Sequence, residues 1–321
     1  MQRVHFIAIG GEAMHNLAIA LSKKNEYEVT GSDDEIFEPS YSRLKENGLL
    51  PREIGWFPER IHKNLNAVIL GMHAAEDNPE LIRAKELGIH IYSFPEYLFQ
   101  QTRSKTRIVV GGSHGKTTTT AMILFVLKKC RIKADYIVGE QIEGFNEKIK
   151  LSFESRIAVF EGDEYLTSML DRRPKFHLYK PHIAILTGIA WDHINVFPTF
   201  EFYVDQFRKF LNTLETQARL IYFAGDENLK MLTDEAENTR RDVVSFPYNT
   251  PKYETRDGVT YVKTRKGEVA LKIFGEHNLQ NLEAAHLACR QIGVTDDHFY
   301  EAIADFPGVS GHMQKIVQKP G

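Results

Sequence analysis

The amino-acid sequence predicts an α/β protein with two domains, each built on a parallel β-sheet. The first observation is that short apolar segments alternate with segments of helical period along most of the chain. Such alternation is typical of parallel sheets that helices cover on both faces. The second is the length of 321 residues, which exceeds one average domain. The third is a polar stretch at 100–105, after which the alternation restarts, so we place the domain boundary at residue 105.

The first domain, residues 1–105, is predicted to begin with a strand, a tight turn at Gly10-Gly11 and a helix. Another helix is expected at Asn78–Leu87, with Asn78 as its N-cap and a proline in its first turn. Strands are predicted at Val4–Ile9, Tyr27–Thr30 and Ala67–Met72.

The second domain, residues 106–310, restarts with a strand, a glycine-rich turn and a long helix. Between Lys252 and Phe274 the apolar period changes to two, with turn signals at Asp257-Gly258 and Lys266-Gly267, so β-hairpins are predicted there. Strands are expected at Thr106–Val110, Ile157–Phe160, Ile183–Thr187 and Leu220–Phe223. Helices are expected at Thr117–Lys129, Asn278–Ile292 and Asp296–Asp305.

Composition excludes several classes of protein. The formal net charge of −3 argues against a nucleic-acid binder, which would show a basic excess. No apolar run is long enough to span a bilayer, and the first residues enter a strand with no cleavable leader pattern. Cys130 and Cys289 lack metal-ligand spacing and are expected to be reduced thiols. We therefore expect a soluble cytoplasmic protein with no membrane or nucleic-acid partner.

The strongest chemical signal is the run Gly111-Gly112-Ser113-His114-Gly115-Lys116-Thr117-Thr118, between a predicted strand and helix. Backbone N–H groups of such a loop, with the helix N-terminus behind them, form an anion cradle for phosphates. Lys116 is expected to reach the β- and γ-phosphates of a nucleotide, and the Thr117 hydroxyl to ligate Mg²⁺. The strict pattern G-x-x-x-x-G-K-[ST] fails at one position, which Val110 occupies; a lysine that is merely solvated is the structural alternative.

Acidic side chains follow two other predicted strands. Glu161-Gly162-Asp163-Glu164 comes directly after Ile157–Phe160, and Asp192-His193 follows a later strand. Ligands of open α/β sheets bind at the carboxyl ends of the strands, so both clusters are expected near the same phosphates. A solvated loop is the alternative for the acidic cluster, and a histidine satisfied by a backbone carbonyl is the alternative for His193.

The Gly10-Gly11 turn approaches a dinucleotide fingerprint, with Asp33 after the next strand. Ala8 stands at the first glycine position, so the match is incomplete. A nicotinamide-dependent oxidoreductase is one interpretation of this turn, although it leaves the phosphate loop unexplained.

The phosphate loop resembles that of Mur ligases, which depart from the usual pattern at the same position. Further matches fall in order over nearly the whole chain: Gly10-Gly11, Glu161-Gly162-Asp163-Glu164, Asp192-His193, and Gly275-Glu276-His277-Asn278 with Asn281. The resemblance implies a Rossmann-like UDP-binding domain and a central ATP-binding domain. It also implies a ligase that activates the carboxylate of UDP-N-acetylmuramate as an acyl phosphate, using ATP and two Mg²⁺, and joins it to an amine.

Within this family the segments Glu164-Tyr165, Asp171–Phe176 and Trp191-Asp192-His193 are most similar to the branch that recycles peptidoglycan. That branch attaches L-alanyl-γ-D-glutamyl-meso-diaminopimelate. The branch that adds L-alanine usually has serine where this chain has Tyr165, and it is the closest alternative.

The resemblance implies a role for each matching residue. Lys116, Glu161 and His193 are the candidate catalytic residues, and Thr117, Glu161 and His193 the candidate metal ligands. The candidate ATP-binding residues are Gly112, Ser113, His114, Gly115, Lys116, Thr117, Thr118, His277, Asn278 and Asn281. For Asn278 a helix N-cap is an equal alternative. The candidate UDP-sugar residues are Gly10, Gly11, Asp33 and His73, the last equally consistent with a structural role; Glu164, Arg172 and Arg173 are candidate substrate contacts.

Mur ligases have a third domain that binds the incoming amine, and we expect this chain to lack it. Residues 311–321 resemble the family's hinge, but Gly311 and His312 stand where arginines are usual, which puts a phosphate contact in doubt. The chain alone is therefore expected to be incomplete for turnover. A non-catalytic nucleotide-binding or UDP-sugar-binding module is the alternative of another class.

Overall fold

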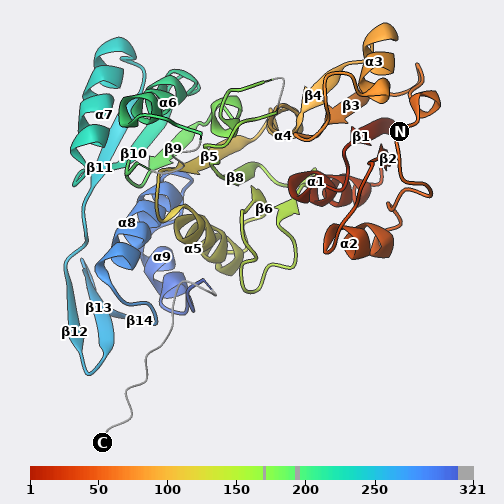
Figure 1. Ribbon diagram of the computed structural model, residues 1–321. Helices are drawn as coiled ribbons and strands as arrows, with labels where there is room; N and C mark the ends of the chain where they lie inside the picture. The colour runs from red at the N-terminus through yellow and green to blue at the C-terminus, as the bar shows by residue number, and fades with distance from the viewer. Residues whose placement is uncertain (169–170, 192–195, 310–321) are drawn as a thin grey trace, which may run out of the picture. The chain divides into compact units, whose positions relative to one another are not determined.

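The computed structural model describes residues 1–168, 171–191 and 196–309, and the chain divides into two compact units (Figure 1). The division after Lys105 coincides with the boundary expected from sequence. Two segments that the sequence assigns to the second domain cluster instead with the first. Unit 1 comprises Met1–Lys105, Ile149–Ser155 and Asp163–Lys180; unit 2 comprises Thr106–Lys148, Arg156–Gly162 and the chain from Pro181 onward.

Unit 1 contains a parallel sheet in the strand order β2-β1-β3-β4. β1 and β3 are the two central strands. After β1 the chain continues to β2 at one edge of the sheet, and after β3 it continues to β4 at the other edge. Because such crossovers are right-handed, the connecting helices α1 and α3 cover opposite faces. Its elements are β1 (Gln2–Ile7), α1 (Glu12–Ser22), β2 (Tyr27–Ser32), α2 (Ser40–Glu46), η1 (Pro58–Arg60), β3 (Ala67–Leu70), α3 (Pro79–Glu86), β4 (Ile91–Ser93), α4 (Phe94–Thr102), β7 (Ile149–Lys150) and η2 (Lys175–Leu178).

Helix caps in unit 1 show where sequence signals hold. The Asn78 side chain accepts hydrogen bonds from the backbone N–H groups of the first turn of α3, as predicted. Ser93 and Glu96 form a reciprocal capping box at α4. The prediction of a linker from Gln100 to Lys105 is wrong in its first half, because residues 100–102 are the last turn of α4. The buried apolar face of this nine-residue helix keeps residues 100–102 helical, although their composition is polar.

Unit 2 contains a larger parallel sheet, whose strands lie in the order β11-β10-β9-β5-β8-β6. Helices α5, α8 and α9 lie on one face of this sheet, and α6 and α7 lie on the other (Figure 1). Its elements are β5 (Thr106–Gly111), α5 (Lys116–Lys129), β6 (Ala134–Ile137), β8 (Ile157–Glu161), β9 (Ile183–Leu186), α6 (Phe200–Asn212), β10 (Arg219–Phe223), α7 (Glu227–Thr239), β11 (Val244–Tyr248), β12 (Tyr253–Arg256), β13 (Val259–Thr264), β14 (Gly267–Leu271), α8 (Glu276–Gln291) and α9 (Asp296–Ile303).

Helix α5 is the centre of the unit 2 core. It packs against α8, α9 and β8, so most of its circumference is buried. Each fully buried Leu, Ile, Val or Met side chain contributes about 1.5–3 kcal/mol relative to exposure. This packing holds the N-terminal end of α5, and with it the glycine-rich loop, against the carboxyl ends of the strands.

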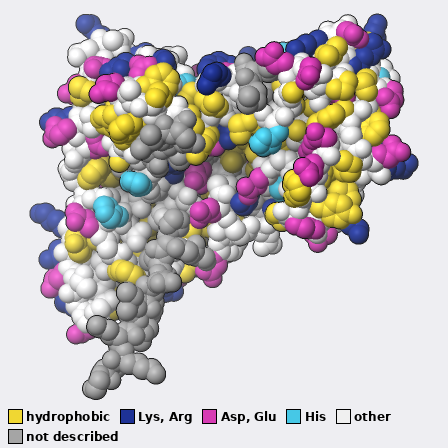
Figure 2. Space-filling view, viewed as in Figure 1, with side chains coloured by type: hydrophobic (Ala, Val, Ile, Leu, Met, Phe, Trp, Pro, Cys, Tyr) yellow, Lys and Arg dark blue, Asp and Glu magenta, His cyan; other side chains and the backbone are white. Residues whose placement is uncertain are grey.

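The predicted hairpins form a separate three-stranded antiparallel sheet, β12-β13-β14. Asp257 and Gly258 both have positive φ, of 51° and 76°, as a two-residue hairpin turn requires. No helix of the described residues is long and apolar enough to cross a membrane. Basic and acidic side chains are interspersed on the face shown in Figure 2, in keeping with the small net charge.

Candidate functional site

The glycine-rich loop joins β5 to α5 in unit 2. Helix α5 begins at Lys116, with Gly115 as its N-cap at φ 79° and ψ −2°. This left-handed conformation is open to glycine and costly for other residues. A side chain at Gly115 would also collide with Asn281, whose Cγ lies 3.0 Å from the position of an added Cβ. The loop therefore presents bare backbone at the start of a fourteen-residue helix, as an anion cradle requires.

Three polar side chains meet beside this loop. The Lys116 ammonium donates to the Gly112 carbonyl at 2.6 Å, so it already lies over the loop. The Thr117 hydroxyl donates to Glu161 Oε1 at 2.7 Å, which joins the first turn of α5 to the end of β8. The other oxygen, Glu161 Oε2, accepts the backbone N–H of Gly139 at 2.8 Å. Sequence reasoning predicted that these residues share a site, and the structure brings them together.

The donor set at this point fits Mg²⁺. A hydroxyl and a carboxylate are the hard oxygen ligands that Mg²⁺ prefers, and it keeps waters and phosphate oxygens in its remaining positions. In the ranges 1–168, 171–191 and 196–309, no group of three or more His, Cys, Asp or Glu side chains could hold a metal ion by itself. His193, the third predicted ligand, lies outside the described residues, as do Asp192, Gly311 and His312.

The predicted adenine residues occupy the first turns of α8. Asn278 does not cap the helix: α8 begins at Glu276 with Gly275 as N-cap, and the Asn278 amide donates to the Phe274 carbonyl at 2.9 Å. That excludes the N-cap alternative. Asn281 is largely buried against Gly115, so it belongs to the phosphate loop's surroundings.

Other predicted residues of the nucleotide site differ in exposure. His277 lies at the exposed start of α8, with Nδ1 3.4 Å from Gln280 Oε1. His114 is exposed within the loop, whereas Thr118 is buried in α5. His114 and His277 are therefore open to solvent, whereas the Thr118 side chain belongs to the helix packing.

In unit 1 the Gly10-Gly11 turn lies between β1 and α1, at the carboxyl end of the sheet. The Asp33 side chain folds over it and accepts the Gly10 N–H at 2.6 Å. An added Cβ at Gly10 would lie 2.8 Å from Asp33 Oδ2, whereas at Gly11 it would meet nothing nearer than 3.6 Å. His73 is exposed after β3. Because the chain diverges from β1 and β3 in opposite directions, these residues surround a topological switch point, where open α/β sheets bind ligands.

Burial raises the pKa of Asp33 from 3.8 to about 6, and neighbouring Asp34 adds to the rise; hydrogen bonds from the Gly10 and Glu35 backbone act in the opposite direction. A carboxyl group that titrates near pH 6 beside a glycine turn changes the charge of that turn in the weakly acidic range.

The candidate substrate residues Glu164, Arg172 and Arg173 belong to unit 1. Residues 165–168 pair with 171–175 through backbone hydrogen bonds. Arg173 is held by Asp171, with Nη2 to Oδ2 at 2.6 Å, and this contact lowers the pKa of Asp171. Glu164 is buried, whereas Arg172 is exposed. Arg173 is exposed as well, but its guanidinium is paired with Asp171.

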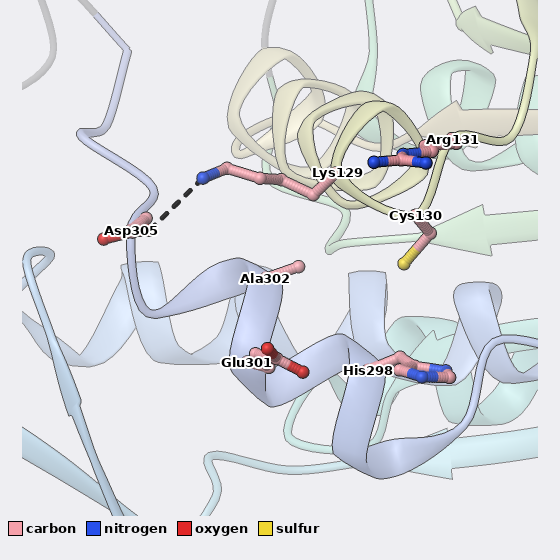
Figure 3. Close-up of a pocket in the computed structure, with 7 residues that line it drawn as sticks. All are labelled: Lys129, Cys130, Arg131, His298, Glu301, Ala302 and Asp305. Carbon is pink, nitrogen blue, oxygen red and sulfur yellow. Dashed lines mark hydrogen bonds and ion pairs between the residues drawn. The ribbon is translucent and has the colours of Figure 1, made fainter.

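A pocket of about 360 Å³ lies at the opposite end of α5 (Figure 3). Its lining comes from the end of α5 and from α9, and Lys129 pairs with Asp305 across it. A helix of fourteen residues is about 20 Å long, so this pocket is separate from the phosphate loop. Charges of both signs line it, which does not suit a polyphosphate; the lining residues are Lys129, Cys130, Arg131, His298, Glu301, Ala302 and Asp305.

Several residues around the phosphate loop were missed by sequence reasoning. Thr187 lies directly after β9, and its hydroxyl donates to the His114 carbonyl. Asp226 caps α7 and also accepts the Ile189 N–H at 2.6 Å. Because aspartate is a favoured N-cap residue and Asp226 directly precedes α7, its capping role could have been predicted from the sequence. Thr187 carries no local signal, because its role depends on strand order.

A doubly wound α/β unit with a strand–loop–helix phosphate cradle and an adjacent hydroxyl–carboxylate pair defines a nucleotide-dependent enzyme. Comparison with protein-family profiles shows the family to which the chain belongs. Residues 3–106 match the profile described as "Mur ligase family, catalytic domain", and residues 110–289 match "Mur ligase middle domain". The chain belongs to the Mur ligase family, whose members are ATP-dependent ligases.

Individual relatives divide between two activities. UDP-N-acetylmuramate–L-alanine ligase of Carboxydothermus hydrogenoformans is 30% identical over 100% of this chain and 68% of its own length. The Escherichia coli enzyme named UDP-N-acetylmuramate–L-alanyl-gamma-D-glutamyl-meso-2,6-diaminoheptandioate ligase is 29% identical over 95% of this chain and 67% of its own. A Neisseria meningitides ligase of the second name has the same fold, with a TM-score of 0.81 at 24% identity, covering 95% of this chain and 98% of that one.

Proposed function

We propose that this chain serves an ATP-dependent ligase that joins L-alanyl-γ-D-glutamyl-meso-diaminopimelate to the carboxylate of UDP-N-acetylmuramate through an acyl phosphate. Unit 2 binds ATP with Mg²⁺, and the Gly10-Gly11 turn of unit 1 binds the UDP diphosphate. One observation carries the proposal: the bare glycine loop, the Lys116 ammonium and the Thr117–Glu161 pair meet at the carboxyl ends of β5 and β8.

The chemistry needs these groups because a free carboxylate is a poor electrophile. Bound ATP supplies the phosphoryl group that makes the carboxylate reactive, and Mg²⁺ offsets the charge between the two anions. Lys116 exchanges the Gly112 carbonyl for a phosphate oxygen and stabilises the negative charge that develops there. Thr117 would ligate one Mg²⁺, and Glu161 would hold a second together with His193, as the family resemblance implies.

The choice of amine rests on the segment that follows the acidic cluster. Tyr165 and the run Asp171–Phe176 resemble the tripeptide-adding branch. In this segment Asp163 accepts the Lys175 ammonium at 2.6 Å and Asp171 holds Arg173, which leaves the exposed Arg172 to meet an anionic substrate. L-Alanine is the second candidate, because a relative with that activity is 30% identical over the whole chain.

The nucleotide site is tested by ligand-induced stabilisation. ATP with Mg²⁺ at about a hundredfold above Kd should stabilise the protein by roughly 2.7 kcal/mol, and Lys116→Ala should lose that gain. Lys128→Ala is the matched control, because it removes an ammonium from the far end of the same helix. Equal thermal shifts in the wild type and Lys116→Ala would exclude this loop as the ATP site.

Carboxylate activation is tested separately from the amine. ATP, Mg²⁺, UDP-N-acetylmuramate and hydroxylamine should give the hydroxamate of the sugar nucleotide, detected by mass spectrometry. Replacing hydroxylamine by the tripeptide or by L-alanine then tests both amine candidates, together with the expectation that the chain alone does not complete the ligation. A product with L-alanine alone would favour the second candidate, and binding of ATP with no hydroxamate would point to a non-catalytic module.

A further inference from the structure

Ser113, in the middle of the phosphate loop, is tied to another part of unit 2. Its hydroxyl donates to the Ala190 carbonyl at 2.6 Å and accepts the Ala190 N–H at 2.8 Å. The Tyr203 hydroxyl of α6 lies 3.1 Å away. Ser113 is 8% exposed and Tyr203 is fully buried. The three contacts form a polar cluster, which we call the Ser113 clamp.

The clamp uses the full hydrogen-bonding capacity of the Ser113 hydroxyl. A serine hydroxyl has one proton to donate and two lone pairs, and these match the Ala190 carbonyl, the Ala190 N–H and the Tyr203 hydroxyl. The backbone N–H of Ser113 donates to the Gly188 carbonyl at 2.9 Å. Ser113 therefore has no donor left for a phosphate, although sequence reasoning placed it among the ATP-binding residues.

The segment that Ser113 holds, residues 187–190, follows β9 and is fixed from its other side as well. The Thr187 N–H donates to the Gly111 carbonyl at 3.1 Å, and Asp226 accepts the Ile189 N–H at 2.6 Å. β5 and β9 are neighbours in the sheet, and from them the chain moves outward in opposite directions. The clamp thus joins the two strand ends that border the switch point of unit 2, where a ligand is expected.

We propose that Ser113 is a positioning residue: through Ala190 and Tyr203 it fixes the phosphate loop against the segment after β9, so that the backbone of the loop faces the nucleotide phosphates. The inference deepens the proposed function and rests on it for the identity of the nucleotide. Anion binding by backbone groups depends on their alignment before the ligand arrives, so loss of the clamp weakens binding without removing a contact to ATP.

A first experiment measures the clamp without any nucleotide. Trp191 follows Ala190 directly and is 45% exposed, and Trp56 is the only other tryptophan. In a Trp56→Phe background, acrylamide quenching of fluorescence reports on Trp191 alone. Because less than half of the residue is exposed, release of the segment in Ser113→Ala should raise the quenching constant about twofold. Thr239→Ala, which removes an exposed helical hydroxyl elsewhere in unit 2, is the control and should leave it unchanged.

A second experiment measures affinity for ATP with Mg²⁺ by calorimetry. Ser113→Ala should raise Kd about tenfold, equivalent to ~1.4 kcal/mol, and Tyr203→Phe, which removes one of the three contacts, should raise it about twofold to threefold. Ser113→Thr keeps the hydroxyl and should restore wild-type affinity. Rescue by threonine would show that the hydroxyl is what the loop needs. Thermal melts without ligand measure separately whether each variant loses stability.

The outcomes distinguish the two proposals. A wild type that binds no ATP refutes the nucleotide site, and the quenching result still shows whether the clamp holds the segment. A wild type that binds ATP, with Ser113→Ala unchanged in affinity, overturns the positioning role. Unchanged quenching in Ser113→Ala overturns the clamp itself.

Discussion

Gly115, at the start of α5, is a position where the phosphate loop is sensitive to a single methyl group. Two costs follow from the structure for Gly115→Ala. The left-handed backbone at φ 79° costs a non-glycine residue about 1–2 kcal/mol. The added Cβ also lies against Asn281, 3.0 Å from its Cγ, where Asn281 is only 8% exposed and has little room to move. Overpacking of this kind costs about 1–3 kcal/mol, so the total destabilisation is about 2–5 kcal/mol.

Gly293→Ala separates the two costs. Gly293 has a similar φ of 90° in unit 2, and nothing lies within 4 Å of an added Cβ. We expect it to cost the backbone share alone, ~1–2 kcal/mol. Urea denaturation of both variants measures the difference in the free energy of unfolding. The double variant Gly115→Ala/Asn281→Ala should recover most of the excess, because the colliding amide is gone. If Gly115→Ala proves no more destabilising than Gly293→Ala, the close approach of α8 to the loop is refuted.

Two further predictions concern unit 1. The pKa of Asp33 is raised from 3.8 to about 6, so its contribution to stability is present below pH 3.8 and lost as pH rises through 6. Between these two pH values the wild type should lose stability relative to Asp33→Asn. Parallel pH profiles of the two melting temperatures would contradict this. Gly11→Val should abolish UDP-N-acetylmuramate binding while ATP binding persists, because a Cβ at Gly11 meets no protein atom nearer than 3.6 Å and the added side chain would obstruct the proposed diphosphate site rather than the fold. Unchanged sugar-nucleotide affinity by calorimetry would place the UDP site elsewhere.

Sequence reasoning succeeded where the signal is local. The loop before Lys116 needs glycine at a left-handed position and a helix directly behind it, and both needs are visible in the residues themselves. The Asn78 cap and the Asp257-Gly258 turn are of the same kind. Each depends on a few consecutive residues, so tertiary packing had little to add.

The features that sequence reasoning missed depend on which segments become neighbours. Asn281 touches Gly115 only because α8 packs along α5. Ser113 meets Ala190 only because β9 lies beside β5, although β6, β7 and β8 lie between them in the chain order. Helices α6 and α7 were also missed, although their signals are local: Thr199 and Asp226 cap them, and each helix buries one apolar face. A single sequence contains no direct record of strand order, so these contacts could not be derived.

The division of the chain into two units limits how it can be truncated. The polypeptide passes from one unit to the other at 105/106, 148/149, 155/156, 162/163 and 180/181. A fragment that ends at Lys105 would therefore lack β7 and η2, which pack against α1 and α4, and the Phe153 ring that lies 4.0 Å from the Lys24 ammonium. Such a fragment would expose apolar surface that the later segments normally cover. Neither unit is a cassette that recombination could transfer in one piece, so the two are expected to be inherited together.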